Sequence, residues 1–262
     1  TTATASYDTA AAKIAAYAQD DGAAAPATND YANAGITGAT DRTTSLVNDR
    51  IDGLSATEVD TVAQVQALVS AAAAVMSGAA AGTAPTLAQL NALGVTGVTA
   101  DNLAAVQAAL AAATDATQLN SLSGAQSIVT TATASYDTAA AKIAAYAQDN
   151  GVDLITNPAP VLADYTALGV TGIGGTGQPT VAMLSSALAD TDITGTLADT
   201  AAKVQTIVDA YQAIVQSADG EANNDTVNPT QAQYAAIGVN GVDTAQEISL
   251  LGDVLDTASR NG

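Results

Sequence analysis

The chain of 262 residues contains no cysteine and no histidine. These absences exclude thiol and imidazole nucleophiles, the Ser-His-Asp triad, haem ligation and the usual zinc sites, because each depends on one of the two missing side chains. Disulfide bonds are excluded for the same reason. We therefore expect no enzyme, and the sequence offers no catalytic, cofactor-binding or metal-binding residues to assign.

Basic and aromatic residues are also scarce. Lys and Arg total 6 against 26 Asp and Glu, which gives a net charge of -20. So few positive charges exclude a protein that follows nucleic-acid phosphates or binds an anionic membrane surface. Trp and Phe are absent and only 8 Tyr remain, so the large side chains that usually fill a core are few. No apolar run is long enough to cross a bilayer, and we expect no membrane insertion.

Alanine is abundant, with 64 residues. Alanine has the highest helix propensity and loses almost no side-chain entropy on folding. Its small side chain lets helices approach closely, but burying its methyl group contributes only about 0.8 kcal/mol. The composition therefore predicts an all-α protein whose small helical units depend on their neighbours for stability.

The sequence repeats itself in three ways. Residues Thr1 to Asp20 recur unchanged at Thr130 to Asp149. A motif P-x4-[YL]-x2-[ALI]-G-[IV]-[TN]-G-[AVI] recurs four times, starting at Pro26, Pro85, Pro160 and Pro229. A shorter motif, [VA]-Q-x-[IL]-V, follows the first three copies and contains Gln66, Gln126 and Gln205. Such internal similarity predicts a tandem array.

Each unit is predicted to contain three helices. The first begins at the proline, with Asn228 before Pro229 as an N-cap, and it ends at a glycine in the left-handed conformation. These glycines are Gly94, Gly169 and Gly238 in the last three copies. The second helix starts at a capping box that runs from Asp243 to Gln246. The third helix carries the glutamine motif.

The third helices differ in predicted length. They end near Ser77 and Ser217 in the first and third units, but the second runs to about Asp149 and stops at Gly151. Its predicted apolar face follows a 3–4 spacing, and its residues are Val129, Ala132, Tyr136, Ala140, Ile143 and Ala147. The predicted divisions are 1–22 (a third helix only), 23–82, 83–155, 156–226 and 227–262 (two helices).

The ends of the chain fall inside units. Because Thr1 aligns with Thr130, the chain begins within a third helix, and it ends before another. We expect a piece of a longer repetitive protein or a segment of an assembly. The first helix would expose Tyr7, Ile14 and Tyr17. Head-to-tail association, or the next repeat of a longer chain, would then cover it.

Few residues suggest chemistry. The pairs Asp20-Asp21 and Asp190-x-Asp192 are interpreted as solvated turn acids. Asp219, Glu221, Asn223 and Asp225 alternate like calcium-loop ligands, but Asn224 and Thr230 replace the glycine and glutamate of that motif, so calcium binding lacks a complete motif. Asn224-Asp-Thr226 matches a glycosylation acceptor.

Three other features are interpreted structurally. The glycine cluster from Gly172 to Gly177 is expected to form an extended turn. Tyr31, Tyr165 and Tyr234 share a motif position with Leu90, which indicates packing rather than ligand stacking. The lysines are expected to pair with acids on their own helices; these pairs are Lys13 with Asp8, Lys142 with Asp137, and Lys203 with Asp199.

The copies ALGVTGVTADNLAAVQAAL and the glutamine-motif helices resemble the helical tandem repeats of giant bacterial surface proteins, the type I-secreted adhesins, and their GA-like three-helix modules. The Ala, Thr, Asp and Gly richness without Cys is similar to that of S-layer proteins. The resemblance implies an extracellular, structural repeat that forms a filament, stalk or adhesin extender by stacking. The alternatives are a helical module that binds a host protein or ligand, and an S-layer-type surface coat.

Overall fold

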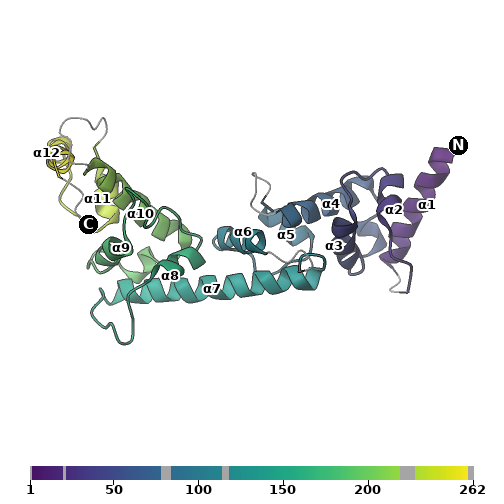
Figure 1. Ribbon diagram of the computed structural model, residues 1–262, viewed down its shortest axis with the longest axis horizontal. Helices are drawn as coiled ribbons and strands as arrows, with labels where there is room; N and C mark the ends of the chain where they lie inside the picture. Colours follow the sequence, from purple (N-terminus) through teal and green to yellow (C-terminus); the bar gives the residue numbers. More distant parts are fainter. Residues whose placement is uncertain (1, 20–21, 78–83, 114–117, 219–227, 259–262) are drawn as a thin grey trace. The chain divides into compact units, whose positions relative to one another are not determined.

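The regular structure is helical, as the composition predicts. The computed structural model describes residues 2–19, 22–77, 84–113, 118–218 and 228–258. Within these ranges there are α-helices and short 3-10 helices and no strand (Figure 1). No helix of the described ranges combines the length and the apolar character needed to cross a bilayer.

The chain forms two compact units, Thr1–Thr133 and Ala134–Gly262. The division falls inside the long helix α7 (Leu122–Gln148), so each unit contains a part of that helix. This division is coarser than the five predicted segments.

The described part of the first unit contains six complete helices and a short 3-10 turn. They are α1 (Thr2–Tyr17), α2 (Thr28–Asn33), α3 (Asp41–Ile51), η1 (Ala56–Glu58), α4 (Val62–Ser77), α5 (Leu87–Ala92) and α6 (Leu103–Ala112). Helix α1 packs on α2, α3 packs on α4, and α4 packs on α5. One apolar cluster joins these helices to the first turns of α7, and it includes Leu46, Leu68, Leu90, Val106 and Val129.

The second unit repeats part of this order. It contains the rest of α7 and then α8 (Leu162–Ala167), α9 (Val181–Leu188), η3 (Gly195–Leu197), α10 (Ala201–Ser217), α11 (Gln231–Ala236) and α12 (Ala245–Asp256). Helix α10 packs on α9, α11 and α12. A helix that carries the glutamine motif therefore packs on the short helix that follows it in both units, as α4 on α5 and α10 on α11.

The glycine caps are confirmed. Gly94, Gly169 and Gly238 have φ of 80°, 78° and 87°. At the end of α5, Gly94 N–H bonds to the Asn91 carbonyl and Val95 N–H to the Leu90 carbonyl, at 2.9 and 3.0 Å. This is the Schellman arrangement, in which a buried apolar residue follows the glycine.

The predicted starts of the short helices are wrong by two residues. The N-cap is the residue after the proline, so Asn228 is not a cap. At Thr230 the hydroxyl accepts from Gln233 N–H, while the Gln233 side chain accepts from Thr230 N–H at 2.7 Å. This capping box stabilises a helix that starts two residues later than predicted. The buried proline then lies just outside the helix, at the hydrophobic-staple position, which packs on the buried tyrosine or leucine of the first turn.

The capping box predicted from Asp243 to Gln246 is shifted by one residue. Thr244 is the N-cap of α12, and Glu247 is its partner three residues later. The Glu247 carboxylate accepts from Thr244 N–H at 2.9 Å, which Gln246 is not placed to do. This backbone bond, made to the ionised form, lowers the pKa of Glu247.

The third-helix predictions are confirmed. Helices α4 and α10 end at Ser77 and Ser217, and α7 continues to Gln148 with Gly151 in the left-handed region after it. All residues of the predicted apolar face of α7 are buried: Val129, Ala132, Tyr136, Ala140, Ile143 and Ala147.

Helix α1 corrects one expectation. Ile14, Ala10 and Ala18 are buried, and Tyr17 is partly buried against the same cluster. Of the three residues expected to be exposed, Tyr7, Ile14 and Tyr17, only Tyr7 is, at 40 %. The helix packs on α2, as α4 packs on α5, so it needs no second copy to cover its apolar face.

Candidate functional site: contacts that recur between helices

A glutamine amide joins the turn after each short helix to the third helix that follows. Gln126 Oε1 accepts from Thr96 N–H at 2.8 Å, and its Nε2 donates to the Thr96 carbonyl at 3.1 Å. Gln66 bonds to Thr37 in this way, and Gln205 bonds to Thr171. The threonine lies between the two glycines of the motif, and both of its backbone polar groups are thereby satisfied. The glutamine motif therefore acts as a specific clamp.

The fourth copy departs from this pattern. Asn240 holds the threonine position, and within the described residues no glutamine amide bonds to its backbone. The preceding residue, Val239, is 40 % exposed, whereas Ile36, Val95 and Val170 at the same position are 4 %, 2 % and 7 % exposed. This end of the second unit thus presents apolar surface that the other copies cover.

Two lysines form ion pairs between helices, against expectation. Lys13 Nζ lies 2.5 Å from Asp30 Oδ2, which joins α1 to α2, and Lys142 Nζ lies 2.6 Å from Asp164 Oδ2, which joins α7 to α8. The predicted partners Asp8 and Asp137 are therefore wrong, because each lies five residues before its lysine, a spacing that does not pair side chains on a helix, and the next helix offers a carboxylate. The third pair, Lys203 with Asp199, is confirmed at 2.6 Å.

The carboxylates of these pairs also cap helices. The Asp30 oxygen that contacts Lys13 also accepts from Ala27 N–H at 2.7 Å, and Asp164 accepts from Val161 N–H at the same distance. The hydrogen bond from Lys13 lowers the pKa of Asp30. Asp30, Gln89, Asp164 and Gln233 share this capping position. These capping residues could have been predicted from the sequence, because an Asp or Gln stands four residues after each motif proline.

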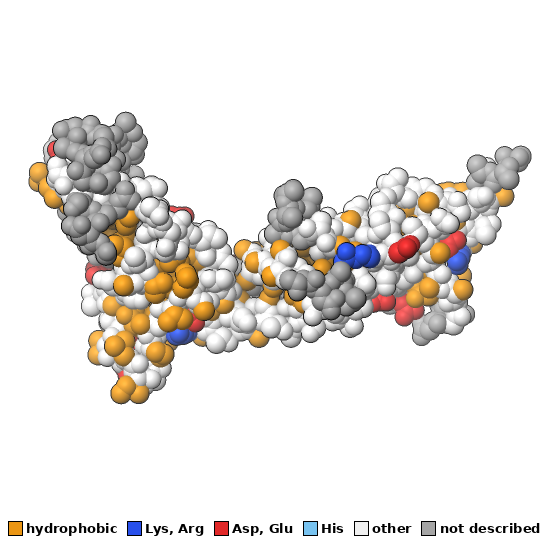
Figure 2. Space-filling model, viewed as in Figure 1, with side chains coloured by type: hydrophobic (Ala, Val, Ile, Leu, Met, Phe, Trp, Pro, Cys, Tyr) orange, Lys and Arg blue, Asp and Glu red, His pale blue; other side chains and the backbone are white. Residues whose placement is uncertain are grey.

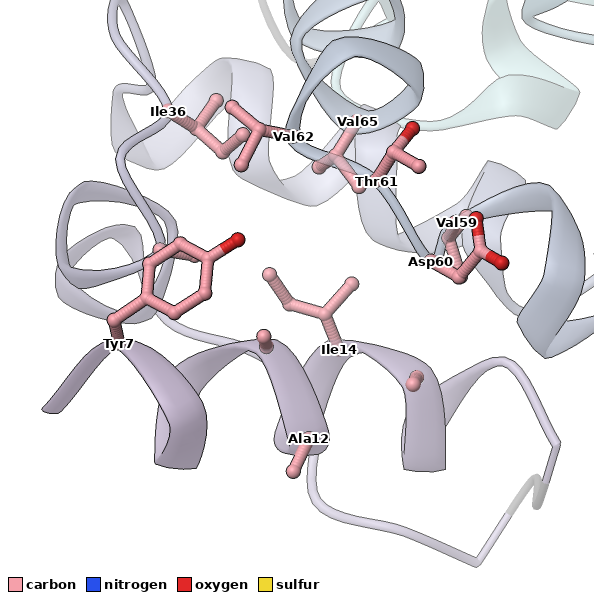
Figure 3. Close-up of a pocket in the computed structure, with 12 residues that line it drawn as sticks. Tyr7, Ala12, Ile14, Ile36, Val59, Asp60, Thr61, Val62 and Val65 are labelled. Atoms are coloured by element: carbon pink, nitrogen blue, oxygen red, sulfur yellow. The ribbon is translucent and has the colours of Figure 1, made fainter. Parts of the chain in front are cut away.

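An open groove of about 240 Å³ lies between α1 and the start of α4 (Figure 3). Tyr7 and Ile14 line it from α1, and Ile36 and Val62 face them. The identical helix sequence in the second unit is packed more tightly. There Tyr136 is 6 % exposed, and its hydroxyl accepts from Ala201 N–H at 3.1 Å. The groove is therefore a looser form of the same helix packing.

Among the described residues, those considered for chemistry do not assemble into a reactive site. No group of three or more acids that could hold a metal occurs among the described residues. Asp192 accepts from the Asn240 amide, and an Asp190 oxygen accepts from Asp192 N–H, so that pair is used structurally. Asp20-Asp21, the calcium candidates Asp219 to Asp225 and the Asn224 glycosylation motif lie outside the described residues.

The glycine cluster and the tyrosines have structural roles. Gly172, Gly174 and Gly177 have positive φ, and Gly174 N–H bonds to the Pro179 carbonyl, so the cluster forms an extended turn. Tyr31, Leu90, Tyr165 and Tyr234 are all buried, in agreement with the packing interpretation. The Tyr31 hydroxyl donates to Asn48 Oδ1 at 2.5 Å, and burial raises its pKa.

Figure 2 shows few charged side chains on the visible face, with Lys or Arg beside Asp or Glu in places, among apolar and uncharged groups. Comparisons with protein-family models, with curated proteins and with solved structures found no match.

Proposed function

We propose that the chain is a structural repeat region, in which three-helix units join in series. The supporting observation is that one set of contacts recurs at successive copies of the proline–glycine motif. Each glutamine clamp fixes a third helix to its own unit, and two of these helices, α4 and α10, pack on the short first helix of the next unit. In such a unit the third helix packs both within its own unit and on the next unit, so the stability of each unit depends on its neighbours.

The proposed role is that of a spacer: a stalk, filament or adhesin extender at an extracellular bacterial surface. The sequence resemblance suggests the location, and the acidic charge of -20 suits a crowded surface where chains must repel one another. Among the described residues, two of the three ion pairs join one helix to the next, Lys13–Asp30 and Lys142–Asp164. This is the pattern that a spacer requires.

The test is a tandem duplication of the chain, compared with the single chain by small-angle X-ray scattering. Serial stacking predicts that the maximum dimension grows by nearly the length of one chain. A duplicated protein that collapses into a globule, with little increase in maximum dimension, would refute the spacer role.

The second candidate, a helical binding module, is favoured by one observation. Leu250 and Val254 on α12 are 67 % and 56 % exposed, an unusual concentration of apolar surface on one helix. A monomeric binding module predicts that a host protein covers this helix and that the duplicated chain gains no ordered length.

A further inference from the structure

We propose that the exposed face of α12 binds the first turn of another helix, one with a leucine just before it. A unit of the same repeat type on another molecule supplies this helix. The α12 face is defined here as Gln246, Leu250 and Asp253. The proposal rests on the proposed function in one respect, which is that units of this type join to one another.

The first unit shows how such a face is covered, because α3 already binds a helix start. The Asp49 carboxylate of α3 accepts from Leu122 N–H, in the first turn of α7, at 2.9 Å. Arg42 Nε donates to Asn120 Oδ1 at 3.4 Å. Leu46 lies between these two positions on the helix and is fully buried, in the apolar cluster that also contains Leu119 and Leu122.

The two helices α3 and α12 match when they are counted from their caps. Thr40 caps α3 and Thr244 caps α12, and each hydroxyl accepts the N–H of the third helical residue. Counted in this way, three pairs of residues hold equivalent positions: Leu46 and Leu250, Asp49 and Asp253, and Arg42 and Gln246. The inward positions agree as well, because Asn48 and Gly252 correspond and both are buried.

The surroundings of the matched residues differ sharply. Leu46 is 0 % exposed, but Leu250 is 67 % exposed. An open hollow of about 360 Å³ lies over α12, lined by Ala245, Gln246, Ser249, Leu250 and Asp253. Gln246, Leu250 and Asp253 hold the positions by which α3 contacts the start of α7. The α12 face therefore carries an exposed leucine and an aspartate at the positions that are occupied in α3, without an occupant among the described residues.

The chemistry defines the occupant. The start of a helix presents free N–H groups and a partial positive charge, which the Asp253 carboxylate complements as Asp49 does. A leucine shortly before that helix would cover Leu250, in the way that Leu119, with Leu122 packed against it, belongs to the apolar cluster in which Leu46 is buried. This pairing of leucine and aspartate is not general to the repeat, because α9 has Ser186 and Ala189 at the same two positions after its cap Thr180.

The test uses the full chain and a synthetic peptide that spans residues 118–149, labelled with fluorescein at its C-terminus. Fluorescence anisotropy should show saturable binding. Leu250→Asp and Asp253→Asn should each weaken binding at least tenfold, since each removes one half of the contact. Val152→Asp is the matched control, because Val152 is an exposed apolar residue away from α12, and this variant should bind as the wild type does.

Two further measurements separate the alternatives. A peptide with Leu119→Asp should not bind, and hydrogen exchange in α12 should slow only with the unchanged peptide. The proposal would be overturned if the peptide did not bind. It would also be overturned if the peptide bound equally well to Leu250→Asp, because the peptide would then have exchanged with α7 of the chain. Self-association of the chain alone that is lost in Leu250→Asp but kept in Leu119→Asp would assign the face to a different contact between copies and would overturn the proposed occupant. None of these results changes the length expected of the duplicated chain.

Discussion

The clearest test of the packing is to replace three equivalent capping glycines by alanine. Gly35, Gly94 and Gly238 all have positive φ, so each alanine carries the cost of a left-handed conformation, about 1–2 kcal/mol. Their surroundings differ. A Cβ at Gly35 meets nothing within 4 Å, and at Gly94 it meets the movable Arg50 guanidinium at 3.0 Å. At Gly238 it would lie 2.5 Å from Asp190 Cγ and 2.8 Å from its Cβ.

The expected costs follow from these distances. Gly35→Ala and Gly94→Ala should each destabilise their region by about 1–2 kcal/mol, because the arginine tip can move away. Gly238→Ala should cost about 1–3 kcal/mol more, since a short aspartate fixed at the end of a helix cannot yield in the same way. Urea denaturation followed by circular dichroism gives the free energies, and hydrogen exchange in α11 locates the effect.

A double variant isolates the close approach. Asp190→Gly should reduce the cost of Gly238→Ala to that of Gly35→Ala, because it removes both atoms that the new methyl group meets. Equal costs at Gly35 and Gly238 in the parent chain would refute the reasoning, and so would a double variant that recovers nothing.

Three other predictions follow from single contacts. Gln126→Ala should lower the free energy of unfolding by about 1–2 kcal/mol in urea denaturation, because two hydrogen bonds to Thr96 are lost; an unchanged midpoint would contradict the clamp. Tyr31→Phe should cost about 1–3 kcal/mol in the same assay by leaving Asn48 Oδ1 buried without its donor, whereas Tyr234→Phe should be nearly neutral, since the buried Tyr234 hydroxyl bonds to no described residue. Because the pKa of Asp30 is lowered in the fold, its stabilisation is present above its unfolded pKa of about 3.9 and is lost as the pH falls through the folded value. The melting temperature of Asp30→Asn should therefore lie below that of the wild type at pH 7 and approach it in acid, and a constant difference would contradict the pairing.

The sequence predicts those features that depend on local geometry. Spacing along one helix determines which side chains share a face, so the buried residues of α7 from Val129 to Ala147 could be read directly. A glycine after a short amphipathic segment likewise predicts a left-handed cap, as at Gly94 and Gly238.

Contacts between helices could not be read in the same way. Lys13 follows the acid on its own helix, Asp8, by five residues, which is one more than the spacing that pairs side chains on a helix, and in the fold it pairs with Asp30 of the next helix. The helix starts were misplaced because a proline is compatible with more than one position near a helix start. The reciprocal hydrogen bonds between Thr230 and Gln233 determine where the helix starts, and these bonds can be identified only once the backbone is known. Likewise, the glutamine of each repeat was recognised as a motif, but its bonds to Thr37, Thr96 and Thr171 depend on the fold.

The double use of each glutamine-motif helix has a consequence for how such a protein changes length during evolution. A helix such as α4 contacts α3 before it and α5 after it, and each side of that contact is encoded by residues close together in the sequence. Recombination between the identical stretches Thr1–Asp20 and Thr130–Asp149 would insert or delete whole blocks and rejoin the same helix sequence at the junction. Length could then vary in discrete steps without any compensating substitution.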